Sequence, residues 1–249
     1  MKQLIQYRCF VFCATGLLFV FPSCNIREEI WLNKNGSGKY TYEIVTDPKA
    51  TELFTSNFPA EGKASDVLEI MSQKDIDTIL PQKEYSNMLQ PAFPNMFNKT
   101  TLNLKSDHKI QELKFRIQIP FKNIAELNEG ISNFRFMKLS IFRNAFADTI
   151  TKAAQFYELK DGALKRNKVE DFSRGLPVTQ TDLELGKLMF MNSYQTIVFH
   201  LPNKVKSTSY VNRETEEETV EVKEKTVTVK MPFAGILTEK NKVTGKIEF

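Results

Sequence analysis

Residues 26–45 read IREEIWLNKNGSGKYTYEIV, and they predict the first β-hairpin of the fold. The flanking segments Ile26–Leu32 and Tyr40–Val45 are rich in β-branched and aromatic residues, which favour strands. Between them, Asn35-Gly36 readily adopts the positive φ angles that a tight turn requires. The stretch therefore predicts two antiparallel strands joined by a short turn.

A second strand pair is predicted at Thr100–Lys105 and Lys109–Ile119, where apolar and polar residues alternate on either side of the turn 106–108. Pro120 ends that pattern. Phe121–Ile131 then places apolar residues at the spacing of one helix face. This order predicts a hairpin followed by a helix.

The corner between strand and helix recurs late in the chain. Phe115–Ile124 parallels Val227–Ile236, since each is an alternating strand followed by Pro-Phe and an apolar helix position. Two halves built on one β-β-α unit would explain the match. Alternatively, proline simply suits the start of a helix. So short a match does not decide between the two interpretations.

The remaining segments predict further helices and strands. Strand propensity and turn residues favour a hairpin at 155–169 around Asp161-Gly162. We therefore expect an α+β domain: a mostly antiparallel β-sheet built from β-hairpins, with helices packed on one face. The expected helices lie at 47–58, 65–71, 144–154 and 182–189, and the other expected strands at 134–142, 194–201, 204–211, 219–223, 226–231 and 243–249.

The N-terminal segment predicts export from the cytoplasm. Lys2 and Arg8 precede an apolar run at 9–21. This run is too short to span a bilayer comfortably, and its position after basic residues is typical of a secretory signal peptide.

The apolar run leads into Phe21-Pro22-Ser23-Cys24, which resembles the lipobox of bacterial lipoproteins. Leu usually stands at the position of Phe21 and a small residue at that of Pro22. The resemblance implies cleavage between Ser23 and Cys24, and attachment at Cys24 of two or three acyl chains such as palmitate. Several chains are needed because a single one holds a protein only marginally. The alternative is an ordinary cleaved signal peptide with a chance cysteine near the cut.

The cysteine content agrees with a lipid anchor. The three cysteines are Cys9, Cys13 and Cys24, so the chain after Cys24 contains none and can form no internal disulfide. We expect a signal peptide at 1–23 and a single domain at 24–249, stabilised by its core. A two-part build is conceivable, with 24–134 and 190–249 flanking an inserted segment at 135–189.

Charge and motifs argue against several functional classes. The chain has 34 basic and 30 acidic side chains, and removal of the signal peptide leaves 32 basic ones. A nucleic-acid partner is not expected, because such proteins carry a basic stripe. His108 and His200 have no metal-ligand spacing, and no nucleophile or phosphate-binding motif is present. We therefore expect no metal, no cofactor and no catalytic residue. The acidic run at 214–218 is interpreted as a solvated turn.

Phenylalanine suggests a binding role. Six phenylalanines fall within 32 residues and could line an apolar pocket between the sheet and its helices, or could simply form core. The order of the last strands and the early Asn-Gly-Ser-Gly turn resemble LppM-like lipoprotein domains, and this resemblance implies lipid binding. The candidate pocket residues are Phe115, Phe121, Phe134, Phe136, Phe142 and Phe146.

The predicted function is that of a non-catalytic binding or scaffold lipoprotein of the bacterial cell envelope, with the membrane as a partner through Cys24 and with a lipid or envelope protein as ligand. The alternative is a secreted, lipid-anchored hydrolase that uses a carboxylate pair.

Asn25 replaces the Asp that retains some lipoproteins at the inner membrane, which favours the outer membrane. Arg27-Glu28-Glu29 resembles a surface-export tag of such proteins, although a charged strand explains it more simply.

Overall fold

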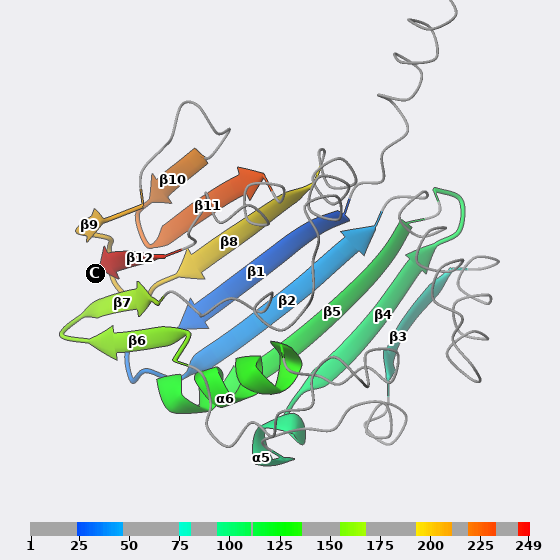
Figure 1. Ribbon diagram of the computed structural model, residues 1–249, viewed down its shortest axis with the longest axis horizontal. Coiled ribbons are helices and arrows are strands. Elements are labelled where there is room, and N and C mark those ends of the chain that lie inside the picture. The colour runs from blue at the N-terminus through cyan, green and yellow to red at the C-terminus, as the bar shows by residue number, and fades with distance from the viewer. Residues whose placement is uncertain are drawn as a thin grey trace, which may run out of the picture.

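The fold is known from a computed structural model, which describes residues 24–46, 75–80, 94–110, 112–135, 155–167, 193–210, 219–232 and 244–249. These residues form two β-sheets and two helices (Figure 1). Within them, no helix is long and apolar enough to cross a membrane.

The larger sheet, named sheet A, has eight strands in the order β10-β11-β8-β1-β2-β5-β4-β3. Neighbouring strands are antiparallel except for β1 and β8, which run parallel. The bounds are β1 Cys24–Leu32, β2 Gly38–Thr46, β3 Ile76–Leu80, β4 Thr101–Asp107, β5 Glu112–Phe121, β8 Tyr194–His200, β10 Thr219–Lys223 and β11 Thr226–Pro232.

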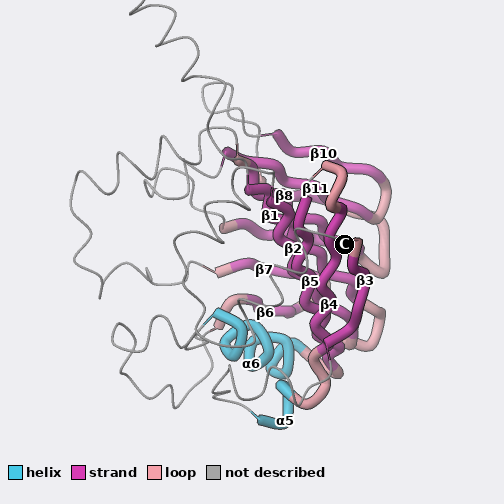
Figure 2. Tube along the Cα trace, turned by 90° about the vertical axis from the view of Figure 1, so that its right-hand side faces the viewer, coloured by secondary structure: helices cyan, strands magenta, loops and turns pink. Residues whose placement is uncertain are grey.

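The smaller sheet, named sheet B, has four antiparallel strands in the order β6-β7-β12-β9. They are β6 Tyr157–Lys160, β7 Ala163–Arg166, β9 Ser207–Thr208 and β12 Gly245–Glu248. Sheet B and helix α6 (Ile124–Arg135) lie on the same side of sheet A, here called its inner side (Figure 2). The short helix α5 (Pro94–Phe97) lies beside α6.

The first predicted hairpin is confirmed. β1 and β2 pair along their whole length, from Cys24 opposite Thr46 to Leu32 opposite Gly38. The amide of Gly36 donates to the carbonyl of Asn33 at 3.0 Å, and Gly36 has a φ of +79°. The Asn-Gly turn thus fixes the register that directs alternate residues of both strands inward.

The strands β4 and β5 are also confirmed, but the turn between them is not at 106–108, because Ser106 and Asp107 belong to β4 and residues 108–110 form the turn. The helix after β5 forms as α6. The helix begins at Ile124 rather than at Phe121, because Phe121 stays in β5 opposite Gly38. Asn123 caps the helix, since its Oδ1 accepts a hydrogen bond from the amide of Glu126 at 3.0 Å. The Glu126 carboxylate accepts in turn from the amide of Lys122 at 3.0 Å, and this bond lowers the pKa of Glu126.

The core of sheet A lies on its inner side. One row of side chains runs across five adjacent strands, and every member is at most 1 % exposed: Val227, Phe199, Ile30, Tyr40 and Ile119. Helix α6 packs against this row, since a Cβ on Gly130 would stand 2.6 Å from Cγ2 of Ile119. The described helix and sheet B therefore cover the end of the inner side where β5 approaches Phe121.

The predicted α+β fold class is wrong. Strands account for most of the described residues, and α6 is the only helix among them that exceeds four residues. Among the described residues, a second sheet and the single helix α6, rather than a layer of helices, pack on the inner side. The chain pairs β7 with β12 across about 80 residues, and no local pattern reveals such a pairing.

Several predicted elements change or lie outside the described residues. The strand expected at 204–211 contributes only Ser207–Thr208, as β9 of sheet B. Residues 134–135 end helix α6 instead of starting a strand. The helices expected at 47–58, 65–71, 144–154 and 182–189 fall outside the described residues, and so do the residues after Pro232 that would test the β-β-α repeat.

Candidate functional site

The predicted site residues are not brought together as one pocket among the described residues. Phe115 is half-buried and Phe121 is 4 % exposed, and both face the inner side of β5. They stand six residues apart, which separates them by about 20 Å along the strand. Phe134 belongs to α6 without a described side chain, and Phe136, Phe142 and Phe146 lie outside the described residues.

The predicted anchor residue has a defined position in the backbone. Cys24 is the first residue of β1 and pairs with Thr46, while Ser23 lies outside the described residues. β1 has three strands on one side and four on the other, so Cys24 leads directly into the middle of sheet A. A lipid on this residue would be attached to the sheet without an intervening tether.

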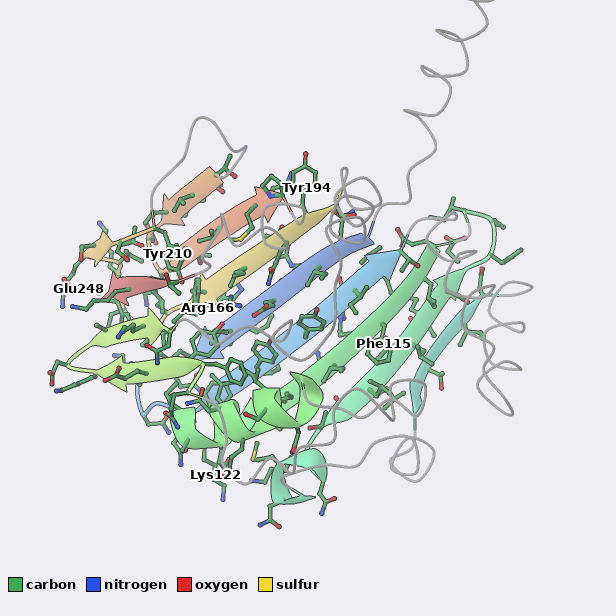
Figure 3. All side chains as sticks on the ribbon, in the orientation of Figure 1. Phe115, Lys122, Arg166, Tyr194, Tyr210 and Glu248 are labelled. Carbon is green, nitrogen blue, oxygen red and sulfur yellow. The ribbon has the colours of Figure 1, made fainter. Side chains whose placement is uncertain are left out.

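A buried ion pair joins the two sheets. Glu28 of β1 is 1 % exposed and points to the inner side, where Arg166 of β7 donates from Nη2 to its Oε1 at 3.2 Å. Gln195 of β8 donates from Nε2 to the same oxygen at 2.5 Å. Figure 3 shows Arg166 where sheet B meets sheet A, beside Tyr210. This cluster of Glu28, Arg166 and Gln195 is named the inter-sheet cluster.

The inter-sheet cluster keeps both charges in a dry environment. Burial alone would lower the pKa of Arg166, but the charge of Glu28 and three neighbouring tyrosines raise it above its usual range. The guanidinium also lies over the ring of Tyr157, 5.7 Å from its centroid. Oε1 of Glu28 accepts hydrogen bonds from both sheets, from Gln195 of sheet A and from Arg166 of sheet B, so the cluster fits a role in positioning sheet B.

The charged triplet Arg27-Glu28-Glu29 is explained by the strand it occupies. Glu28 points inward to Arg166, whereas Arg27 and Glu29 point outward and form an ion pair with each other. All three residues pair with β2 in regular register. This arrangement favours the charged strand over the export tag. Sequence reasoning missed the pairing with Arg166, although a charge between the inward-facing Ile26 and Ile30 was a visible signal.

On β2, β5 and β4, apolar side chains of the inner side lose burial toward the strand ends near Cys24. On β5, Ile117 is 2 % exposed, whereas the next inward residue, Phe115, is only half-buried. On β2, Tyr40 is fully buried, but Ile44 is half-buried. The residues concerned lie on three adjacent strands and are named the half-buried patch: Tyr42, Ile44, Leu104, Leu113 and Phe115.

The half-buried patch is continuous across the strands. Ile44 stands opposite Phe115, and Phe115 stands opposite Leu104, so three apolar side chains form one row. Figure 3 shows Phe115 beyond the end of α6 and away from sheet B. An apolar molecule that covers half-buried apolar side chains removes their exposed surface from water. This burial stabilises the bound state by about 25 cal/mol for each Å² of apolar surface. The patch can therefore hold an acyl chain or a similar ligand.

The outer side of sheet A carries an aromatic and charged cluster. The rings of Trp31 and His200 are stacked, with centroids 4.5 Å apart and planes at 9°. Nζ of Lys39 lies 4.4 Å from the centre of the Trp31 ring on the neighbouring strand. His200 Nε2 stands 3.9 Å from the carboxylate of Glu29. Trp31 is the only tryptophan of the chain, so its fluorescence reports on this cluster.

We predict that His200 of the folded protein takes up a proton at a pH below its ordinary pKa of 6.5, and that this protonation quenches the fluorescence of Trp31. Burial lowers the pKa of His200, the charge of Glu29 opposes this shift, and Arg27 and Lys39 add to it. The unfolded chain therefore takes up the proton first. The stability that neutral His200 provides is complete above pH 6.5, and it is lost as the pH falls through that value toward the lower pKa of the folded state.

The measurement is Trp31 fluorescence of the folded protein between pH 4 and 8. The transition should have its midpoint below pH 6.5 and should vanish in a His200→Gln variant. A His108→Gln variant should keep it, because His108 lies beside Asp75 in the turn after β4, away from Trp31. A midpoint at or above 6.5 in the folded protein would contradict the prediction.

The described residues contain no group of three or more His, Cys, Asp or Glu side chains that could hold a metal ion. His108 instead pairs with Asp75, 2.6 Å from Nδ1 to Oδ1. No protein-family model matches the chain, and no curated protein sequence matches it significantly.

Proposed function

We propose that this protein is a lipid-anchored binding protein of the bacterial cell envelope, attached through Cys24 and holding an apolar ligand on the half-buried patch. The row Ile44, Phe115 and Leu104 carries the proposal, because it places half-buried apolar side chains at the same strand ends as Cys24. A ligand leaving or entering the bilayer would meet the patch close to the anchor. The lipobox-like residues before Cys24 and the phenylalanine content support the same role.

The anchor begins a structural strand, which agrees with cleavage at this point. All nine residues of β1 pair with β2, so removal of residues 1–23 would leave the central hairpin intact. Acyl chains contribute about 0.8 kcal/mol for each buried methylene, and two or three chains anchor a protein durably. We place the protein at the outer membrane because Asn25 follows Cys24.

The hydrolase alternative is not developed further. Among the described residues, Glu28 is the only buried acidic side chain, and it is bonded to Arg166 and Gln195. No observation on these residues favours a pair of catalytic carboxylates.

The experiment that tests the anchor is intact-mass spectrometry of the protein purified from its native membrane, beside a Cys24→Ser variant. We expect a chain that starts at Cys24 and carries two or three acyl chains, and we expect the variant to lose both the acyl mass and the membrane attachment. An unacylated native protein that is cut elsewhere would refute the anchor. The hydrolase alternative would then move ahead.

The ligand is tested on the same preparation by extracting co-purified lipid and by titrating a fluorescent fatty acid. A Phe115→Glu variant should lose most of the binding, because it places a charge in the apolar row. Its matched control is Gln118→Glu, which adds the same charge to the outer side of the same strand and should bind normally. Equal binding by the two variants would exclude the patch as the site.

A further inference from the structure

At the end of sheet A where β1 begins, the turn between β4 and β5 projects beyond the level of Cys24. In the register of sheet A, Cys24 stands opposite Thr46, and Thr46 stands opposite Leu113. β5 continues one residue beyond this level, to Glu112, and the turn at 108–110 lies beyond Glu112. Each strand residue advances the chain by about 3.4 Å, so the turn projects roughly 5–7 Å past the level of Cys24.

The turn is also close to the anchor in the plane of the sheet. β2 is the only strand between β1 and β5, and β4 is the next strand beyond β5. Adjacent strands are about 4.8 Å apart, which places the turn about 10–15 Å to the side of Cys24. Since Cys24 is itself the first residue of β1, acylation of Cys24 would hold these strand ends against the bilayer.

The side chain at the tip of this turn suits a membrane interface. Ile110 is 57 % exposed, although it is a large apolar residue. Oδ1 of Asp107 accepts hydrogen bonds from the amides of Lys109 and Ile110, at 3.1 and 3.4 Å, and so holds the tip in shape. Lys109 precedes the apolar tip and is exposed, as lysine residues are at membrane surfaces.

A second contact zone lies on the other side of Cys24. Tyr194 begins β8, the strand next to β1, and its amide donates to Oδ1 of Asn25 at 3.2 Å. Nζ of Lys230 lies 4.0 Å above the Tyr194 ring. Figure 3 shows Tyr194 at the same end of sheet A as the start of β1. Tyrosine with lysine is a usual combination at the level of lipid headgroups.

We infer that the β4–β5 turn at 108–110 inserts into the interface of the anchoring bilayer with Ile110 at its tip, so that sheet A stands upright on the membrane. The inference rests on the proposed lipid anchor at Cys24. The turn contacts the bilayer, rather than another partner, because the acylated Cys24 is the first residue of β1 and holds this end of the sheet at the membrane. Upright strands would bring the half-buried patch next to the membrane surface and would keep Trp31 about 24 Å away from Cys24 along β1.

The experiment uses the acylated protein in phosphatidylethanolamine–phosphatidylglycerol liposomes. Acylation consumes the Cys24 thiol, and Cys9 and Cys13 precede the expected cut, so an added cysteine is the only free thiol of the mature protein. An Ile110→Cys variant is labelled with a polarity-sensitive fluorophore. The matched control, Lys34→Cys, labels an exposed position in the β1–β2 turn at the opposite end of the sheet.

We expect the label at position 110 to shift its emission to shorter wavelength and to be quenched by headgroup-region spin-labelled lipid. The label at position 34 and the intrinsic fluorescence of Trp31 should not change. If the protein floats with the liposomes but the label at 110 stays unquenched, the insertion is refuted while the anchor stands. If the protein does not float and Cys24 itself takes up label, the lipid anchor fails instead.

Discussion

Replacement of Arg166 by Met should lower the free energy of unfolding by about 3–5 kcal/mol, because it leaves the carboxylate of Glu28 buried without its cation. Arg166 approaches Glu28 from the other sheet, and Gln195 alone cannot neutralise the charge. Urea unfolding measures the loss as a shift of the midpoint.

A second substitution separates the charge from the packing. Glu28→Gln in the Arg166→Met background keeps an oxygen that accepts from Gln195 but removes the unpaired charge. It should restore about half or more of the lost stability, because a buried ion pair replaced by neutral groups of similar volume is often neutral.

The control for this pair is the exposed ion pair between Lys105 and Asp77 on sheet A. Lys105→Met should leave the free energy of unfolding almost unchanged, because solvent screens such pairs. If Arg166→Met were as mild as Lys105→Met, the inter-sheet cluster would not stabilise the packing of sheet B on sheet A.

Replacement of Gly38 by Ala should destabilise the central hairpin by about 3 kcal/mol or more, at the upper end of the cost of overpacking. A Cβ at this position would overlap the carbonyl oxygen of Trp31 and would stand 2.6 Å from Cζ of Phe121. A phenylalanine ring can shift, but the Trp31 oxygen belongs to the backbone of a central strand. The first residue of β2 must therefore be glycine for steric reasons.

The matched control is Gly36, which lies two residues earlier, in the turn between β1 and β2. Gly36 has a positive φ of 79°, and its Cβ would meet only the Leu159 side chain, at 3.5 Å. Gly36→Asn should cost about 1 kcal/mol or less, because asparagine tolerates this backbone conformation better than most residues. Thermal unfolding of both variants measures the difference, and equal melting temperatures would show that the backbone at Gly38 can relax.

The proposed anchor and the apolar row differ in how much of each the sequence alone could predict. Cys24 is predicted as the anchor from its neighbours in the chain, because the patterns of a signal peptide and a lipobox are linear. Phe115 was found as part of a phenylalanine-rich segment, but the residues beside it were not. Ile44 and Leu104 join it through strand pairing, which depends on the register of β2, β5 and β4.

The sequence by itself determined the local elements of this protein. Alternation and turn residues are short-range signals, so the Asn-Gly hairpin of β1 and β2, the strands β4 and β5 and a helix at 121–131, which the structure has at 124–135, could be predicted. The parallel contact of β1 with β8, the second sheet and the pairing of Glu28 with Arg166 were decided only by tertiary structure. These contacts join residues more than 75 positions apart, and their energies depend on burial and register that no local pattern encodes.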